Sequence, residues 1–390
     1  MSFQNLICKD QEFTHLCPLN TPNLGLCVLE PGDCHRSIKR DRRMIPTTSD
    51  SQLTLGHEFG YVEEHLHEDC GQSQLVPVYQ RTYQTTQPMG KKFSACTWNV
   101  WGLLKYTEHF LNWSIRKRLT HIIETIVSQK VDLLCLQEVS NPVFKILHEK
   151  LKDEYYFYEE SIDTDKTRKT YNRGLENLFL SKKPASSFTN YRLGGNLGYS
   201  GNLSVLEFPD LLVFGCYLQA GSKYSPGQEN NWFHYSRCRS EQLETIWQLC
   251  QQEPRRAKII MGDMNFHLDG SVDEWPEVRQ LDKFKKMGFI DSYRSLFPSN
   301  PGLTENTKIN LMRYNSKFLE KRFRYDGILS FGLHPIDSVI LGTEQIELTD
   351  EQIAEMIDVF VYKKDTKRMR VNRRLALWPS DHFGIMTIFG

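Results

Sequence analysis

Near its C-terminus the chain reads Trp378-Pro379-Ser380-Asp381-His382-Phe383-Gly384, which puts a carboxylate beside an imidazole just before an apolar segment. Three stretches upstream share this layout: Thr97-Trp98-Asn99, Leu136-Gln137-Glu138 and Gly262-Asp263-Met264-Asn265. Each ends a pattern typical of a buried strand, where a sheet delivers side chains to one rim. Carboxylate, amide and imidazole groups gathered on one rim would suit a hard divalent cation beside a hydrolytic centre. The four stretches therefore predict a single polar site.

Outward from these stretches, strand and helix patterns alternate from residue 93 onward, as in an α/β protein. Ser114 is predicted to cap a helix that carries an apolar stripe from Ile115 to Val127. A second helix is predicted over residues 240–251, and Gly288 is predicted to close a third. Thr349 and Gln352 form a capping-box pattern that starts another helix. Strands are predicted at residues 93–100, 131–139, 211–218, 257–265, 324–330 and 383–389.

Residues 1–90 differ from the rest and are predicted to be an N-terminal extension that contains cysteine and histidine, followed by one domain over residues 91–390. Residues 77–92 have the composition of a linker. Five of the ten cysteines fall in the first 70 residues, but no Cys-x-x-Cys occurs, so thiols are favoured over a zinc site. The start of the chain has no secretory pattern, which predicts an intracellular protein with reduced thiols.

The bulk composition sets limits on partners. The chain has 390 residues with a net charge of zero, so only local patches could attract nucleic acid or anionic lipid. No apolar run approaches the ~18 residues that span a bilayer. The composition carries no signal for an oligomeric state.

Each candidate site residue also has an ordinary explanation. Glu138 would suit a Mg²⁺ ligand, but a carboxylate at a strand end can also cap the next helix. Asn99 could bind metal-linked water or simply form a turn. Asp263 and Asn265 point to one side and could hold a water, although Gly-Asp-x-Asn is also a common turn.

His382 is the sharpest of these signals. A lone histidine is more often structural, but Asp326, on a strand of its own, could pair with it in an Asp-His dyad. The carboxylate would fix the imidazole tautomer and leave the other ring nitrogen for phosphate or water.

The four stretches, taken in this order, resemble the endonuclease/exonuclease/phosphatase superfamily over about residues 93–390. The resemblance implies a four-layer α/β sandwich, in which two packed mixed β-sheets are flanked by helices. It also implies hydrolysis of a phosphoric ester with Mg²⁺ or Mn²⁺.

The resemblance assigns roles by position. It implies that Glu138 is the principal metal ligand, with Asn99 and Asp381 on the metal side. It implies that Asp263 orients or deprotonates the attacking water, with Asn265 beside it. In the same scheme His382 contacts the scissile phosphate and Asp326 orients it.

Features of several subfamilies are mixed. Asn306-Thr307-Lys308-Ile309-Asn310 and Lys321-Arg322-Phe323 are similar to tyrosyl-DNA phosphodiesterase 2. Asn99-Val100-Trp101-Gly102 and Leu218-Gln219-Ala220-Gly221 resemble neutral sphingomyelinases instead. Tyr217 stands where many members carry histidine, and it resembles a phosphate-contacting tyrosine of apurinic endonucleases. Tyr217 is therefore a candidate neutral donor, and weakened activity is the alternative.

Basic residues near these stretches are candidate substrate contacts. Arg237 and Arg239 follow the Tyr217 strand and could brace the site, although exposed charges at a helix start are the ordinary explanation. Lys367, Arg368 and Arg370 belong to a basic run over residues 363–374 that could hold a nucleic-acid backbone or form a solvated loop.

These observations favour a metal-dependent phosphodiesterase that acts on nucleic-acid-linked phosphate, such as a 5′-tyrosyl-DNA phosphodiesterase-like enzyme or a nuclease. The alternatives are a sphingomyelinase-like phospholipid phosphodiesterase and a non-catalytic binding module that kept the fold.

Overall fold

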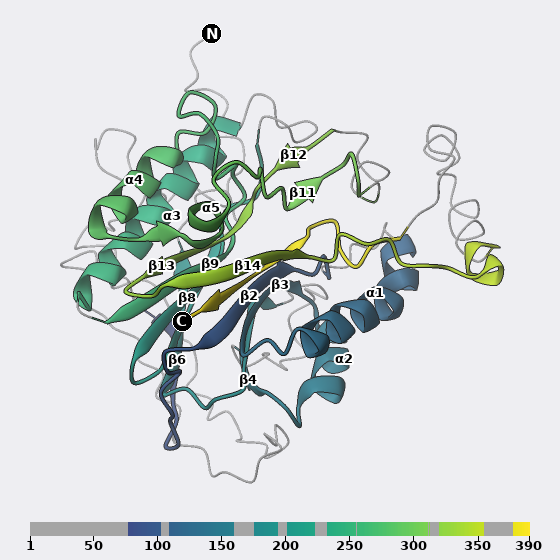
Figure 1. The fold of residues 1–390 in the computed structure, drawn as a ribbon, viewed down its shortest axis with the longest axis horizontal. Coiled ribbons are helices and arrows are strands. Elements are labelled where there is room, and N and C mark those ends of the chain that lie inside the picture. The colour runs from purple at the N-terminus through teal and green to yellow at the C-terminus, as the bar shows by residue number, and fades with distance from the viewer. Residues whose placement is uncertain are drawn as a thin grey trace, which may run out of the picture.

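The computed structural model describes two packed β-sheets with helices outside them (Figure 1). The described residues are 77–102, 109–159, 175–193, 201–222, 232–254, 256–310, 312, 320–354 and 377–390.

The larger sheet has seven strands, and those that bear site residues lie toward one side of it. Its spatial order is β1 (Pro77–Thr82), β6 (Ser187–Leu193), β7 (Gly201–Glu207), β8 (Leu211–Tyr217), β9 (Ala257–Asp263), β13 (Asp326–Phe331) and β10 (Ile290–Asp291).

The smaller sheet has six strands, and two neighbouring strands within it, β15 and β2, come from opposite ends of the described chain. Its spatial order is β14 (Pro335–Leu341), β15 (Gly384–Phe389), β2 (Phe93–Asn99), β3 (Leu133–Val139), β5 (Leu175–Ser181) and β4 (Tyr156–Tyr158). A separate two-stranded ribbon joins β11 (Glu305–Asn306) to β12 (Arg322–Phe323).

Helices cover the outer face of each sheet (Figure 1). They are α1 (His109–Ser128), α2 (Asn141–Leu151), α3 (Trp232–Gln252) and α4 (Val278–Met287). Helix α5 (Ser292–Leu296) instead contacts β13 and β14, one strand of each sheet, and its Tyr293 belongs to the core between the sheets. The helices α1 and α2 pack on the six-stranded sheet, whereas α3 and α4 pack on the seven-stranded sheet.

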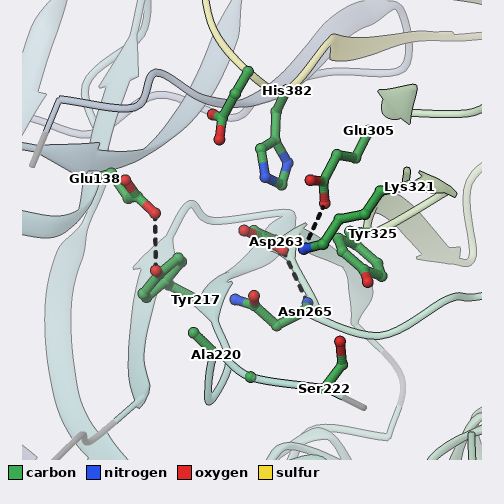
Figure 2. Close-up of a pocket in the computed structure, with 12 residues that line it drawn as sticks. Glu138, Tyr217, Ala220, Ser222, Asp263, Asn265, Glu305, Lys321, Tyr325 and His382 are labelled. Atoms are coloured by element: carbon green, nitrogen blue, oxygen red, sulfur yellow. Dashed lines mark hydrogen bonds and ion pairs between the residues drawn. The ribbon is translucent and has the colours of Figure 1, made fainter. Parts of the chain in front are cut away.

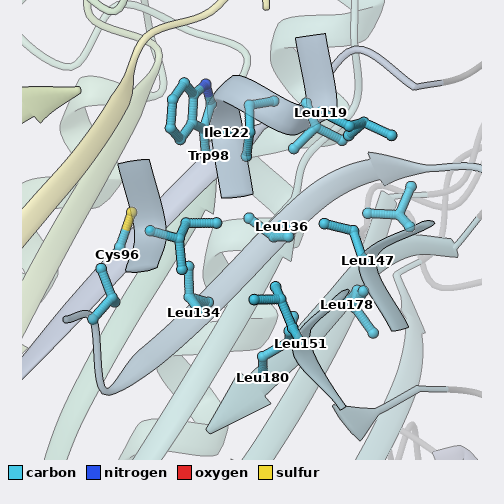
Figure 3. Close-up of a cluster of buried hydrophobic side chains, with 14 of the residues drawn as sticks. Cys96, Trp98, Leu119, Ile122, Leu134, Leu136, Leu147, Leu151, Leu178 and Leu180 are labelled. Carbon is cyan, nitrogen blue, oxygen red and sulfur yellow. The ribbon is translucent and has the colours of Figure 1, made fainter. Parts of the chain in front are cut away.

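Strand alternation builds the layers. In β3, Leu134 and Leu136 face α1 and α2, as Figure 3 shows, while Leu133 and Cys135 pack between the two sheets. Both faces of β3 are therefore buried, which explains its nearly continuous apolar run. The inter-sheet core also takes Met261 of β9. The layers run helix, sheet, sheet, helix, and form the four-layer α/β sandwich that the sequence resemblance implied.

Several predicted boundaries are wrong. Helix α1 begins at His109, so Ser114 lies inside it and its hydroxyl accepts a hydrogen bond from Arg118 Nε at 3.3 Å. Helix α3 begins at Trp232, ahead of the predicted start. Its first two turns mix aromatic residues, including the exposed Phe233, with polar ones and show no apolar stripe, so the sequence pattern did not reveal them. Gly288 does close α4, with φ +101, as predicted.

The linker prediction for residues 77–92 is also wrong. Residues Pro77–Thr82 form β1 and pair with β6 at an edge of the seven-stranded sheet. Pro77 stands at the first position of an edge strand, where its missing N–H group costs no ladder hydrogen bond. The polar residues that alternate with Tyr79 gave the segment the composition of a linker. Met89 is buried in the inter-sheet core. The proposed domain therefore includes residues from at least Pro77.

Other local predictions are confirmed. The Thr349 amide donates to Gln352 Oε1 at 3.1 Å, and the Gln352 amide donates to Thr349 Oγ1 at 3.3 Å, which is a reciprocal capping box. Cys135 and Cys216 are buried core thiols. Within the described residues, no helix combines the length and the apolar character needed to cross a membrane. The cysteines and histidines of the first 70 residues lie outside the described chain.

A buried ion-pair network fixes the entrance to β13. Arg324 is buried and donates to both oxygens of Asp269 at 2.8 Å, and it also pairs with Asp291 at 2.7 Å. Burial alone would raise the pKa of Asp269, but hydrogen bonds and charges from Arg324 and Arg294 outweigh it and lower that pKa below its ordinary value.

We expect Asp269→Asn to reduce the free energy of unfolding by about 2 kcal/mol at pH 7, since a charge-assisted hydrogen bond is lost. A carboxylate with a lowered folded-state pKa adds stability above its unfolded pKa of about 3.9, and this is lost as the pH falls. The deficit should therefore shrink below about pH 4. Urea unfolding of wild type and Asp269→Asn at pH 7 and at pH 3 measures this deficit in the free energy of unfolding. Asp282→Asn is the control, because Asp282 is exposed. An equal deficit at both pH values would contradict the network's role.

Candidate active site

The six-stranded sheet supplies Asn99 at the end of β2 and Glu138 near the end of β3. These two strands are parallel neighbours, with Asn99 opposite Gln137, so their ends reach the same rim. Glu138 has φ +58, in the left-handed region that a non-glycine residue rarely adopts. Strain of this kind is found where function requires a particular side-chain direction.

The seven-stranded sheet supplies a row of three residues in register. Tyr217 ends β8 opposite Asp263 of β9, and Asp326 begins β13 opposite the same Asp263. Gly262 allows this close pairing, because a Cβ on it would lie 1.8 Å from the carbonyl oxygen of Cys216.

Asn99 joins the two sheets. Its Nδ2 donates to Glu138 Oε1 at 3.2 Å and to Asp263 Oδ2 at 3.0 Å. Tyr217 Oη donates to the same Glu138 oxygen at 2.9 Å. Carboxylates from different sheets are therefore held together by one amide.

His382 and Asp326 form the predicted contact, with His382 Nδ1 2.8 Å from Asp326 Oδ2. Both side chains are buried, and the His382 carbonyl accepts a hydrogen bond from Trp98 Nε1 at 3.0 Å. Burial would lower the pKa of His382, but the carboxylates of Asp326 and Asp263 outweigh it and raise that pKa well above the usual value. The protonated imidazole is therefore favoured in this pair.

Asp263 itself sits in an unusual environment. Burial, followed by the charge of Asp326, raises its pKa to about 7. The Asn265 amide donates to Asp263 Oδ1 at 2.9 Å, and Asn265 Nδ2 donates to the Leu218 carbonyl at 2.9 Å. Asn265 adopts φ +54, a conformation that asparagine tolerates better than most residues. A carboxyl group with this pKa can exchange a proton near neutral pH.

Glu138 and Asp381 form a second acidic pair. Burial first, and then the charge of Asp381, raise the pKa of Glu138. Ser380 ties this turn to β2, because its Oγ donates to the Asn99 carbonyl at 2.6 Å. Arg118, fully buried behind the turn, donates to the carbonyl oxygens of Val100 and Pro379 at 3.1 Å.

Several of these side chains border one cavity of about 140 Å³, drawn in Figure 2. Most of its lining is polar. The lining residues are Glu138, Tyr217, Ala220, Gly221, Ser222, Asp263, Asn265, Glu305, Lys321, Tyr325, Asp381 and His382.

The model of the Endonuclease/Exonuclease/phosphatase family matches residues 96–382, which is more than half of the chain. The chain belongs to this family. A search of curated protein sequences gave no significant match.

Solved structures support the same fold at low identity. TDP2 from D. rerio, complexed with a single-strand DNA product, superposes with a TM-score of 0.53 and 17% identity, covering 77% of this chain and 100% of that one. Beta toxin from Staphylococcus aureus superposes with a TM-score of 0.53 and 17% identity, covering 76% of this chain and 99% of that one. A protein of the endonuclease/exonuclease/phosphatase family from Bacteroides thetaiotaomicron superposes with a TM-score of 0.52 and 15% identity, covering 79% of this chain and 98% of that one. At this identity the likeness concerns the family fold alone.

The structure gathers most of the site residues that the sequence singled out. Around the cavity or in direct contact with its lining lie Asn99, Glu138, Tyr217, Asp263, Asn265, Asp326, Asp381 and His382.

The arginines of α3 lie elsewhere. Arg239 is buried, bonds Glu277 Oε1 at 2.6 Å, and donates to the carbonyls of Gln219 at 2.8 Å and Gly221 at 2.6 Å. Protein groups thus occupy its guanidinium, so the prediction that Arg239 contacts substrate is wrong. Arg239 instead braces the loop that floors the cavity, the other role that the sequence suggested for it. Arg237 is largely exposed, pairs with Glu241 at 3.0 Å and does not line the cavity. The predicted contacts Lys367, Arg368 and Arg370 lie outside the described residues.

Sequence reasoning missed one wall of the cavity, formed by Ser222, Glu305, Lys321 and Tyr325. Glu305 begins β11 and Lys321 directly precedes β12, and these two strands have two residues each and leave no periodic signal. The available signals were the Lys321-Arg322-Phe323 stretch, already noted for its resemblance, and the position of Tyr325 just before Asp326.

Proposed function

We propose that this family member is a divalent-metal-dependent phosphoric ester hydrolase, most specifically a phosphodiesterase acting on nucleic-acid-linked phosphate. The observation that carries the proposal is the link through Asn99, which holds Glu138 and Asp263 within one cavity that also receives His382. This arrangement supplies a cation site, a base and a protonated donor together.

The donor set at Glu138 and Asp381 fits Mg²⁺ or Mn²⁺. Two carboxylates close enough for the charge of one to raise the pKa of the other repel each other, and a divalent cation would relieve that repulsion. Among the described residues, both hydrogen bonds to Glu138 fall on Oε1, which leaves Oε2 as the oxygen for a cation. When bound there, the cation would supply positive charge for the phosphoryl oxygens.

A second group of potential ligands is less suitable. Atoms of Asp263, Asp326 and His382 lie within 4.8 Å of one another. His382 Nδ1 is already hydrogen-bonded to Asp326, so the closeness of His382 and Asp326 needs no cation to explain it. We therefore propose the cation at Glu138 and Asp381.

The side chains then divide the work of hydrolysis. Asp263, aligned by Asn99 and Asn265, orients the attacking water and accepts its proton. The Asp326 carboxylate holds Nδ1 of His382, so Nε2 is directed at a phosphoryl oxygen, where an imidazolium stabilises developing negative charge. Neither role requires movement of the strands.

The nucleic-acid substrate rests on two supports. One relative, D. rerio TDP2, has been crystallised with a single-strand DNA product. The cavity is lined mostly by polar groups, which suits a phosphate and its hydrophilic neighbours better than an acyl chain.

An assay panel tests the proposal. Purified protein with Mg²⁺ or Mn²⁺ would be offered 5′-phosphotyrosyl DNA, abasic duplex, single-stranded DNA, RNA, sphingomyelin and an inositol polyphosphate. Hydrolysis of a nucleic-acid substrate that chelation abolishes is the expected result. Selective sphingomyelin cleavage would replace the substrate class, and no turnover with any substrate would favour a binding module.

Tyr217 gives a smaller, specific prediction. Tyr217→Phe removes the 2.9 Å hydrogen bond to Glu138, and with it a neutral donor near the phosphate. We expect about a tenfold fall in kcat/KM, which corresponds to a hydrogen bond of about 1.4 kcal/mol. Tyr191→Phe serves as the control, because Tyr191 lies on β6 of the same sheet and does not line the cavity. Equal activity of Tyr217→Phe and wild type would remove Tyr217 from the mechanism.

A further inference from the structure

The floor of the cavity is a short loop whose backbone is held from behind by a buried ion pair. Ala220 and Ser222 line the cavity and lie across it from His382 in Figure 2. Arg239 and Glu277 are both almost fully buried, and Arg239 Nε donates to Glu277 Oε1 at 2.6 Å. Neither of these two residues lines the cavity, so the ion pair lies on the other side of the loop.

The guanidinium of Arg239 fixes the direction of two peptide groups in this loop. Its Nη1 donates to the carbonyl oxygens of Gln219 at 2.8 Å and Gly221 at 2.6 Å, so both carbonyls point away from the cavity. The peptide bonds of the described residues are all trans, and in a trans peptide the N–H group points opposite to the C=O group. The amides of Ala220 and Ser222, which share these peptide groups, are therefore directed toward the cavity.

Other contacts keep the loop from turning over. The Gln219 amide donates to Gln242 Oε1 at 2.9 Å. Gly221 has φ +113, which favours glycine, and a Cβ on it would lie 2.8 Å from the ring of Tyr235. The direction of the Ala220 amide is therefore set before any ligand binds.

The Ala220 amide is placed to receive an anion. Ala220 is exposed, and among the described residues none accepts a hydrogen bond from its N–H group. A phosphate in this cavity would need such donors, because carboxyl groups in the lining repel it; they belong to Glu138, Asp263, Glu305 and Asp381. A backbone N–H group that is already aimed at the phosphate needs no reorganisation on binding.

We propose that the Ala220 amide donates to a phosphoryl oxygen of the bound ester, and that Arg239 and Glu277 are the positioning residues that direct it. Glu277 neutralises the buried guanidinium, which would otherwise be an unpaired charge. The inference rests on the proposed function and adds a donor on the floor of the cavity, opposite His382. A brace that only stabilises the fold is the competing explanation.

Binding of inorganic phosphate to the full chain in the presence of Mg²⁺, measured by calorimetry, separates the two explanations. Lactic acid in place of alanine at position 220 turns the amide into an ester, so the N–H group is removed while the methyl side chain stays. We expect this ester variant to bind phosphate about tenfold more weakly than wild type, since one hydrogen bond is lost.

The positioning role is tested with Arg239→Lys. Lysine keeps the positive charge but lacks the planar fork that holds two carbonyls and Glu277 together. We expect a similar loss of phosphate affinity, and little further loss when Arg239→Lys is combined with the ester, because both act on one donor. Glu244→Gln is the matched control: Glu244 also ties α3 to α4, through Lys283, but lies outside the cavity lining.

Each part of the proposal has results that would overturn it. Wild-type affinity in the ester variant, or no phosphate binding by the wild-type protein, rejects the Ala220 donor. Wild-type affinity in Arg239→Lys, or an equal loss in Glu244→Gln, rejects the positioning role. If Arg239→Lys does not fold, as judged by circular dichroism, the double variant Arg239→Met/Glu277→Met takes its place, because it leaves neither charge buried without a partner.

Hydrolysis is measured separately, so the two proposals fail in different ways. Absence of turnover across the substrate panel would reject the phosphodiesterase, while phosphate binding would still report on the Ala220 amide. Turnover by wild type, with unchanged kcat/KM and phosphate affinity in the ester variant, would reject the role of the amide alone.

Discussion

The Glu138→Gln variant is expected to hydrolyse its ester about 10²–10³ times more slowly than the wild-type enzyme. Glutamine keeps the size of the side chain, and its carbonyl oxygen can still accept from Asn99 and Tyr217. What it loses is the negative charge that would hold a divalent cation. The fall should therefore appear in catalysis while the free energy of unfolding changes little.

A metal titration makes this prediction specific. Activity of Glu138→Gln should need a higher Mg²⁺ concentration for half-maximal rate than wild type. Glu207→Gln is the control, because Glu207 pairs with Arg256 outside the cavity lining. Full activity of Glu138→Gln at the wild-type Mg²⁺ requirement would place the cation elsewhere.

The second large effect concerns the dyad. We expect His382→Ala and Asp326→Asn each to lower kcat by about 10²–10³, the cost of one lost transition-state contact of ~3–4 kcal/mol. Asparagine at position 326 keeps a hydrogen-bonding group near Nδ1 but removes the charge that favours the imidazolium. The pair acts as one unit, so the double variant should lose little more than either single variant.

The pH profile provides the independent check on the dyad. Because carboxylates raise the pKa of His382, Asp326→Asn should lower it, and the alkaline limb of kcat against pH should move to lower pH. Asp381→Asn, one residue from His382, offers a comparison on the metal side. Additive losses in the double variant, together with an unmoved profile, would separate His382 from Asp326.

Sequence patterns predicted the parts of the fold that depend on burial. The apolar runs that became β3 and β8 are buried on both faces, so they stand out from any neighbouring segment. The polar residues at strand ends were recognisable for the same reason, since Glu138 and Asp263 interrupt otherwise apolar runs. Their order along the chain then led to the family.

What sequence could not supply was the pairing of distant segments. β1 is an edge strand with polar alternation, and its identity depends on β6, more than 100 residues later. Arg239 resembled an exposed charge because its partner Glu277 lies on a different part of the chain. Glu305 and Lys321 meet across a ribbon too short for any periodic signal.

The position of β15 between β14 and β2 has a consequence for synthesis on the ribosome. β2 leaves the exit tunnel early, yet one of its two neighbours is the strand Gly384–Phe389, which is translated long after it. The edge of β2 that later pairs with β15 must therefore stay uncovered, or be shielded by a chaperone, until β15 leaves the ribosome. Because His382 arrives with the same strand, nascent chains halted before it should remain inactive and prone to aggregate.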